Sequence, residues 1–258
     1  MLPNDLIETL AVRLDNAGCE RREIARLTEE VPDLGVDDAY RVMMAGIALR
    51  QARGEHVVGW KMGLTSAAKR EQMNLDRAIW GVLTDAMRVK NDGELAVADG
   101  VHPKIEPEIA LRLGHALTGP VTREEAWEAV DGVCAALEVL DSRYVGFKYF
   151  SLPDVIADNA SSWRFVLGPW QAPCDVADLP MAMAVNDKVV QQGSSAAISG
   201  HPVESLVQLM ALLSDFGITL PADAIILTGA ATIAEPLQPG MRIRLQVPGF
   251  ADVTVTAV

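Results

Sequence analysis

The chain has 258 residues, of which 50% are hydrophobic and 22% are charged. This length suffices for one large domain or for a main domain with a smaller unit, and the composition excludes a disordered protein. The formal net charge of −13 argues against nucleic acid and anionic membrane surfaces as partners, because the field of the whole protein repels both.

The three cysteines lie far apart and form no CxxC pair, which predicts neither a disulfide framework nor a thiolate zinc site. The N-terminus MLPNDLIETL lacks the basic segment and apolar core of a signal peptide. No stretch approaches the roughly 18 uninterrupted apolar residues of a membrane span. We therefore expect a cytoplasmic protein.

Helical spacing of apolar residues predicts two helices near the N-terminus, over 5–17 and 36–53. From residue 55 the pattern changes to strands, in "HVVGWKMGLTS", "GVLTDAM" and "IEPEIALRL". Pro107 interrupts the last of these and favours an edge strand or a bulge.

Thr122 and Glu125 form a capping box, and apolar residues at helical spacing continue from Ala126 to Leu137, which predicts a helix over this stretch. A strand or bend is expected at "LEVLDSRY". A hairpin turning at Asn186 and Asp187, a helix over 202–215 and three short strands complete the chain. Many short strands with few helices, and no GxGxxG loop, predict an α+β fold rather than a doubly wound sheet.

Glu106 and Glu108 are two positions apart in an apolar strand, so both side chains point to the same face. They could converge on a cation, or they could be two ordinary glutamates on a solvated face. Glu138 ends an apolar run and is a candidate third carboxylate, with a salt bridge to Arg143 or to another basic group as the alternative. Three oxygen ligands would suit Mg²⁺ or Mn²⁺ and would leave room for a bidentate substrate.

Lys61 stands between Gly59 and Gly63 on one strand face, where the missing side chains could let a ligand approach, although a solvent-facing lysine would fit equally. The segments "DNASS" (158–162) and "LTGAAT" (227–232) could present hydroxyl, amide and backbone N–H groups to a ligand. They could equally be a helix cap and a tight loop.

A set of ordered blocks resembles the hydratase and decarboxylase family of catechol meta-cleavage pathways, within the fumarylacetoacetate hydrolase superfamily. The blocks are "VVGWKMGLTSAAKREQM", "IWGVLTDAM", "HPKIEPEIA", "LEVLDSRY", "DNASSWRF" and "ILTGA", and they cover nearly the whole chain. His102 and Lys104 in the third block, Trp80-Gly81 and "DSRYVGFKY" are similar to the decarboxylase branch rather than to the hydratases. Trp60 and Trp163 differ from the residues expected of the family and would affect which substituents on the substrate fit.

The resemblance implies a mixed β-roll with flanking helices and a small helical segment at the N-terminus. We expect this helical segment over residues 1–70 and the catalytic domain over 71–258. It further implies that Glu106, Glu108 and Glu138 bind Mg²⁺ or Mn²⁺ and that Lys61 is catalytic. The residues implied near the substrate are Leu64, Asn159, Ser161 and Thr228.

The implied activity is metal-dependent decarboxylation of 2-oxo-3-hexenedioate to 2-hydroxypenta-2,4-dienoate and CO₂. The alternatives are hydration of 2-hydroxypentadienoate, or a non-catalytic metal-binding scaffold for a partner hydratase. The expected partners are a small 2-oxo dicarboxylic acid as substrate, the hydratase of the same pathway, and further copies of this chain in a homo-oligomer. Neither nucleic acid nor a membrane is expected as a partner.

Overall fold

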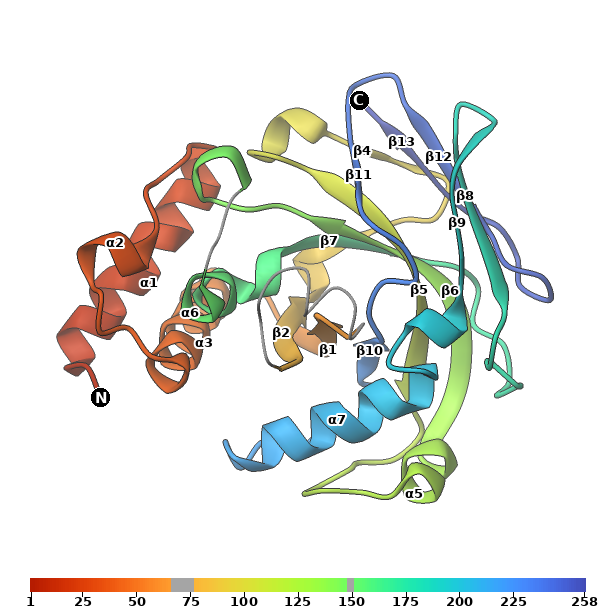
Figure 1. Cartoon of the computed structure of the whole chain (residues 1–258), viewed down its shortest axis with the longest axis horizontal. Coiled ribbons are helices and arrows are strands. Elements are labelled where there is room, and N and C mark those ends of the chain that lie inside the picture. The colour runs from red at the N-terminus through yellow and green to blue at the C-terminus, as the bar shows by residue number, and fades with distance from the viewer. Residues whose placement is uncertain (66–76, 148–150) are drawn as a thin grey trace.

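The computed structural model describes residues 1–65, 77–147 and 151–258 of the chain. Four α-helices gather at one end of the molecule, and two sheets fill the rest (Figure 1). The helices of this end are α1 (Asn4–Glu20), α2 (Leu27–Glu30), α3 (Val36–Ala52) and α6 (Leu152–Ala157). The two long helices predicted near the N-terminus are therefore confirmed, within a few residues at each end.

An eight-stranded mixed sheet runs in the order β2-β1-β10-β5-β6-β7-β3, with β11 pairing with β5 beside this path. Its members are β1 (Val57–Gly63), β2 (Ile79–Thr84), β3 (Arg88–Val89), β5 (Lys104–Leu113), β6 (Val130–Leu140), β7 (Ser162–Leu167), β10 (Ile225–Leu227) and β11 (Glu235–Pro236). β5 and β6 are the longest strands and pair antiparallel over almost their full length. They form the centre on which the site is built.

A second, five-stranded sheet runs in the order β4-β13-β12-β8-β9. Its members are β4 (Gly93–Leu95), β8 (Pro180–Val185), β9 (Lys188–Ser194), β12 (Arg242–Gln246) and β13 (Val253–Ala257). The predicted hairpin turn between β8 and β9 is confirmed, because Asn186 and Asp187 both have left-handed backbone angles. The mixed sheets and separate helices also confirm the α+β fold class.

Short 3₁₀ turns connect several strands: η1 (Asp85–Met87), η2 (Val97–Asp99), η3 (Val145–Phe147), η4 (Asn159–Ser161) and η5 (Ser195–Ala197). Among them, η4 contributes to the site. It joins α6 to β7 and holds three consecutive non-glycine residues at positive φ.

The helix predicted from Thr122 to Leu137 is wrong over most of its length. The capping box is present, but α5 covers Arg123–Glu128 and β6 begins at Val130. β6 is almost entirely buried, and an apolar run of this kind carries no period by which helix and strand can be told apart. Pairing with β5 on one side and β7 on the other decides in favour of the strand.

Pro107 lies in an interior strand, so the edge strand or bulge that was predicted at this residue is wrong. Its carbonyl accepts a hydrogen bond from Ala231 N at 3.0 Å, beyond the end of β10. The proline nitrogen points to the same side of the strand as its carbonyl, toward the 229–231 loop. β5 therefore keeps its ladder with β6 although Pro107 has no N–H.

Helix α7 (Pro202–Ser214) runs below the large sheet (Figure 1). Together with the preceding turn, residues Ser195–Ser214 are long and apolar enough to cross a membrane by length and composition. The apolar residues of α7 are however buried in the main core cluster, at Val203, Leu206, Leu209, Met210 and Leu213. Packing against the core accounts for its composition.

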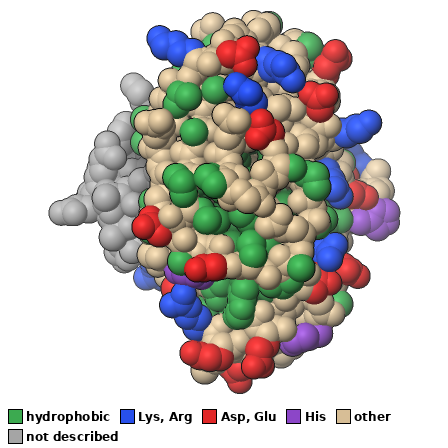
Figure 2. Space-filling model, turned by 90° about the vertical axis from the view of Figure 1, so that its right-hand side faces the viewer, with side chains coloured by type: hydrophobic (Ala, Val, Ile, Leu, Met, Phe, Trp, Pro, Cys, Tyr) green, Lys and Arg blue, Asp and Glu red, His purple; other side chains and the backbone are tan. Residues whose placement is uncertain are grey.

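The face shown in Figure 2 carries a hollowed central region of hydrophobic side chains with charged groups around it. β9 forms one edge of the five-stranded sheet and exposes Val189 and Val190. β1 lies in the large sheet although it falls within the first of the two expected segments. The expected boundary between residues 70 and 71 lies outside the described residues, and the division stays a prediction.

Candidate metal centre

Three buried glutamates meet on one face of the large sheet. Glu106 on β5 is directly opposite Glu138 on β6, and Glu108 follows two positions along β5 on the same face. The exposed fractions of the three residues are 7% for Glu106 and 0% for both Glu108 and Glu138. One carboxylate oxygen of each lies within 4.8 Å of those of the other two. The structure therefore brings together the three carboxylates that the sequence singled out.

Hydrogen bonds hold two of these carboxylates from behind. Gly229 N donates to Glu108 Oε2 at 2.8 Å, and Ser162 Oγ donates to Glu138 Oε1 at 2.9 Å. Glu108 Oε1 is buried and accepts no hydrogen bond from any described residue. A buried carboxylate oxygen without a donor is costly, so this atom fits the ligand of a cation.

Lys61 on β1 contacts the same cluster. Its ammonium lies 3.1 Å from Glu138 Oε2 and donates to Ala160 O at 3.1 Å, and the residue is 2% exposed. Burial lowers the pKa of Lys61, but the charges of Glu138, Glu106 and Glu108 outweigh burial and raise it above its usual value. Lys61 is therefore a cationic hydrogen-bond donor in this site.

The two glycines beside Lys61 play different parts. A Cβ at Gly63 would lie 3.6 Å from Lys61 Nζ, so the missing side chain leaves space beside the ammonium. A Cβ at Gly59 would lie 2.0 Å from Ile225 O, so this glycine allows β10 to approach β1. The expectation of an open face on both sides of Lys61 is therefore wrong for Gly59.

Burial, followed by the charges of Glu138 and Glu106, raises the pKa of Glu108 well above its ordinary value of 4.5. Carboxylates packed this closely and away from water are unfavourable when ionised unless cations lie beside them. Oxygen ligands of this kind are preferred by Mg²⁺ and Mn²⁺. The donor set, its charge and the unbonded Glu108 Oε1 therefore fit a hard divalent cation.

The η4 turn brings two further predicted residues next to Lys61, since Ala160 between them accepts its hydrogen bond. The Asn159 side chain is bonded on both sides to the backbone of Val82, which fixes the turn against β2. Ser161 Oγ is buried and has no hydrogen-bond partner among the described residues. Ser161 thus has an unused hydroxyl, whereas the Asn159 amide is already engaged by β2.

Thr228 and Leu64 are the remaining two residues that the resemblance implies near the substrate. Thr228 is buried, precedes the Gly229 N–H that binds Glu108, and donates its hydroxyl to Ile109 O at 2.7 Å. Leu64 directly follows β1, has a left-handed φ of 57° and is half-buried. Residues 66–76, which follow, lie outside the described part of the chain.

Of the salt-bridge partners that the sequence left open for Glu138, another basic group is found, Lys61, and Arg143 pairs elsewhere. Its guanidinium binds Asp158 through Nε and donates to Asp158 O through Nη2 at 2.8 Å. Asp158 immediately precedes η4, so this buried pair holds the turn that faces Lys61. Sequence reasoning missed this pair, because the spacing of 15 residues follows no helical or strand period.

The two tryptophans that depart from the family's pattern are both buried, at 8% exposure for Trp60 and 6% for Trp163. Trp163 lines a cavity between the N-terminal helices and β7, and the three glutamates are not among the residues around that cavity. The position of Trp163 therefore does not support a role in substrate specificity.

Comparison with known proteins agrees with the geometry. A 4-oxalocrotonate decarboxylase from a Pseudomonas species is 45% identical over 249 residues, which are 96% of each chain. The 2-hydroxyhexa-2,4-dienoate hydratase of Comamonas testosteroni is 34% identical over 261 residues, 99% of this chain and 98% of its own. Both activities expected from the resemblance are thus represented among its relatives.

A solved structure of 4-oxalocrotonate decarboxylase from Pseudomonas putida G7, complexed with magnesium and adipate, superposes with a TM-score of 0.97. It is 36% identical, and the match covers 100% of this chain and 99% of that one. The fumarylacetoacetate (FAA) hydrolase C-terminal family matches residues 47–258. The superfamily and the fold expected from the sequence are thereby confirmed, and the chain belongs to the fumarylacetoacetate hydrolase family.

Proposed function

We propose that this chain is a metal-dependent decarboxylase that converts 4-oxalocrotonate (2-oxo-3-hexenedioate) to 2-hydroxypenta-2,4-dienoate and CO₂. The observation that carries the proposal is the buried cluster of Glu106, Glu108 and Glu138 with Lys61 beside it. The 45% identity to a 4-oxalocrotonate decarboxylase over nearly the whole chain supports this reaction over others of the superfamily.

Glu106, Glu108 and Glu138 would hold Mg²⁺ or Mn²⁺, as the magnesium in the similar solved structure suggests. The ion, when bound, supplies a Lewis acid for the 2-oxo acid end of the substrate. Gly229 N and Ser162 Oγ each fix one carboxylate oxygen and so orient the opposite oxygens. These contacts prepare the ligand geometry before the substrate arrives.

Lys61 would act on the oxygen at C2 of the substrate. When the C6 carboxylate leaves as CO₂, its bonding electrons move through C5, C4 and C3, and negative charge develops on that oxygen. An ammonium whose pKa is raised can donate a hydrogen bond to the developing charge and then a proton to the product. The contacts of Lys61 with Glu138 and Ala160 aim the ammonium into the cluster.

The remaining predicted residues would bind the substrate. Ser161 Oγ has an unused hydrogen-bonding capacity in the buried site and is suited to a carboxylate oxygen. Thr228 and Asn159 would shape the wall through backbone contacts that their side chains already fix. Leu64, half-buried at the end of β1, would cover the hydrocarbon part of the substrate.

The test is incubation of the purified protein with Mg²⁺ and 4-oxalocrotonate, with CO₂ and the dienol measured together. We expect stoichiometric release of CO₂, which EDTA abolishes and either Mg²⁺ or Mn²⁺ restores. Addition of water to 2-hydroxypentadienoate without decarboxylation would instead establish the second candidate, a hydratase, which the 34% identity to the Comamonas hydratase favours.

A non-catalytic scaffold is separated from both enzymes by Glu106→Gln combined with Glu108→Gln. An enzyme loses turnover with its fold intact, whereas a scaffold has no turnover to lose and keeps its partner.

The proposal also includes a cytoplasmic homo-oligomer that associates with the pathway hydratase. The apolar region of the face in Figure 2 and the exposed valines of β9 support an oligomer, which light scattering after size-exclusion chromatography measures.

A further inference from the structure

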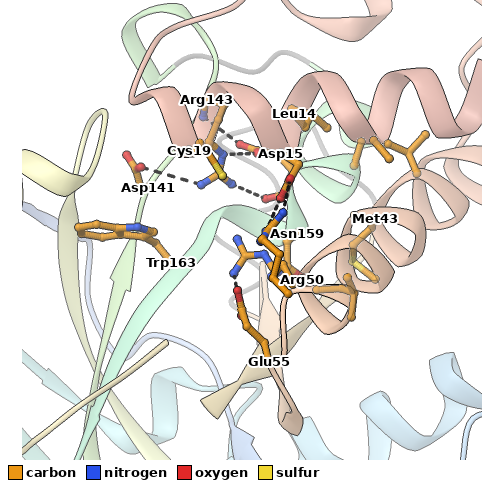
Figure 3. A pocket seen from close by; sticks show the side chains of 18 of the residues that line it. Leu14, Asp15, Cys19, Met43, Arg50, Glu55, Asp141, Arg143, Asn159 and Trp163 are labelled. Carbon is orange, nitrogen blue, oxygen red and sulfur yellow. Dashed lines mark hydrogen bonds and ion pairs between the residues drawn. The ribbon is translucent and has the colours of Figure 1, made fainter. Parts of the chain in front are cut away.

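The cavity that Trp163 lines has a volume of about 320 Å³ and lies between α1, α3 and β7 (Figure 3). Asn159 is the one proposed site residue that also lines it, and the three glutamates and Lys61 lie elsewhere. Its size lies at the lower end of the range of small-molecule sites. Neither the decarboxylation nor the metal cluster uses this space.

The carboxylates around this cavity already have partners. Asp141 accepts from the backbone N–H groups of Val101 and His102, and Glu55 accepts from Thr84 Oγ1. The other three carboxylates form ion pairs with arginines of the same cavity: Asp15 with Arg53, Asp99 with Arg21, and Asp158 with Arg143.

The other two arginines of the cavity are paired weakly or not at all. The Arg50 guanidinium makes no hydrogen bond to any described residue, and its ion pair with Glu55 is long, at 3.9 Å, to the carboxylate oxygen that already accepts from Thr84. Within the described part of the chain Arg164 forms no ion pair; it donates to Trp163 O and stacks 4.6 Å over the Trp163 ring. Half-buried guanidinium groups are normally paired, so their donors are available to an anion.

Desolvation agrees with this geometry. Burial lowers the pKa of both Arg50 and Arg164, although the charge of Glu55 opposes the shift of each. The arginines stay cationic, because a guanidinium ordinarily loses its proton only far above neutral pH. An anion between them would relieve an unfavourable burial of positive charge.

Part of the cavity wall is apolar. α1 contributes Leu14, and α3 contributes Val42, Met43 and Ile47. Figure 3 shows Leu14 and Met43 on the helices, Arg50 in the last turn of α3, and Trp163 on the side of the sheet. A ligand that fills this space therefore meets both guanidinium groups and hydrocarbon.

We propose that this cavity is a binding site for a small organic acid, separate from the substrate site. Its carboxylate lies between Arg50 and Arg164, whose planar forks match a carboxylate, and its hydrocarbon part lies against α1 and α3. Because Asn159 lines the cavity and belongs to the turn that contacts Lys61, the ligand binds directly behind the catalytic turn.

The test is calorimetric titration of the metal-free protein, in EDTA, with acetate, propionate, butyrate and hexanoate, and separately with inorganic phosphate. We expect affinity to rise by about fourfold for each added methylene while the apolar wall is being covered. Phosphate should bind more weakly than butyrate, because it has no hydrocarbon part.

Arg164→Gln should weaken hexanoate binding by about tenfold or more, through loss of a charge-assisted hydrogen bond. Arg50→Gln should do the same, and Arg50→Lys serves if the glutamine variant fails to fold. Arg242→Gln, which removes an exposed arginine outside the cavity, is the matched control and should leave the affinity unchanged. Glu108→Gln should also leave it unchanged, which separates this site from the metal centre.

Three results would overturn the proposal. They are the absence of measurable binding, binding that survives both arginine substitutions, and binding that Glu108→Gln abolishes. Tighter binding of phosphate than of hexanoate would overturn the assignment to organic acids. None of these outcomes depends on whether the chain decarboxylates 4-oxalocrotonate.

Discussion

At the scale of single residues, one buried ammonium faces three buried carboxylates. Lys61 contacts Glu138 and leaves Glu108 Oε1 without a donor among the described residues. A lysine that served only to neutralise charge would suit an arrangement in which all carboxylate oxygens are satisfied. The unbonded Glu108 Oε1 supports separate roles for Lys61 and for a cation.

Lys61→Ala should therefore lower kcat by about two to four orders of magnitude, the usual contribution of a general acid. The affinity for Mg²⁺ should change little, because all three carboxylates remain. Steady-state kinetics with 4-oxalocrotonate and a metal titration measure the two effects, with Lys188→Ala on exposed β9 as control. Unchanged turnover would remove Lys61 from the mechanism.

The Arg143–Asp158 pair is a second feature at the residue scale. Burial raises the pKa of Asp158 to about 6 even though the Arg143 guanidinium opposes this shift. Arg143→Met leaves a buried carboxylate uncompensated, and we expect a loss of about 3–5 kcal/mol in the free energy of unfolding at pH 8. The loss should shrink toward pH 5, where Asp158 becomes protonated.

Urea unfolding at pH 5 and pH 8 measures this dependence. The matched control is the double variant Arg143→Met with Asp158→Asn, which removes the charge and should show no such pH dependence. A deficit of equal size at both pH values in the single variant would contradict the assignment to a buried charge. kcat should also fall, because Asp158 precedes the turn that aligns Ala160 with Lys61.

At the scale of elements, the pairing of β5 with β6 creates the metal centre. Register places Glu106 opposite Glu138, and a shift by one residue would turn either glutamate to the other face of the sheet. The predicted convergence of Glu106 and Glu108 follows from the strand period alone. The place of Glu138 opposite Glu106 did not follow from the strand period, because the stretch before Glu138 was expected to be a helix, and only the family resemblance implied Glu138 as a ligand.

Helix α7 begins with a titratable cap. His201 Nδ1 accepts a hydrogen bond from Val203 N at 3.1 Å, which requires the neutral imidazole. Burial, and then the charge of Arg123, lower the pKa of His201, although Asp175 and Glu204 oppose them. A histidine with a lowered folded pKa contributes stability above its unfolded pKa of about 6.5 and loses it as the pH falls.

His201→Ala should lower the free energy of unfolding by about 1 kcal/mol at pH 8, as for other cap residues. His201→Asn supplies a side-chain oxygen as acceptor in place of Nδ1 and should retain the stability while removing its pH dependence. Thermal unfolding of both variants between pH 5 and pH 8 measures this. A wild-type advantage over His201→Ala that grows toward pH 5 would have the wrong sign for a neutral cap.

At the scale of the whole molecule, the metal centre couples binding to stability. The raised pKa of Glu108 means that the metal-free protein gains stability from this group below about pH 4.5 and loses it as the pH rises through the folded pKa. A cation requires the ionised carboxylate, so its stabilising effect should increase with pH over the same range.

At a Mg²⁺ concentration 100 times Kd, binding should add about 2.7 kcal/mol and raise Tm by roughly 5–10 °C. Glu108→Gln should make the metal-free protein at least as stable as the wild type at pH 8 and abolish the increase with Mg²⁺. Differential scanning calorimetry with Mg²⁺ and with EDTA measures both. An equal Mg²⁺ effect in the variant would place the ion elsewhere.

The sequence by itself determined the elements whose signals are local. Helices α1, α3 and α7, the capping box at Thr122 and the turn at Asn186 and Asp187 follow from periodicity, caps and backbone preference. Charged residues in apolar strands also indicated the candidate metal site, because burying an unpaired charge has a large free-energy cost.

Only the tertiary structure decided which groups meet. The register of β6, the pairing of Arg143 with Asp158 and the approach of Lys61 to Glu138 join residues far apart in the chain. Such contacts depend on strand order and on packing against neighbouring elements, and no local pattern in the sequence indicates either. The cavity behind Asn159 likewise exists only because α1, α3 and β7 pack together.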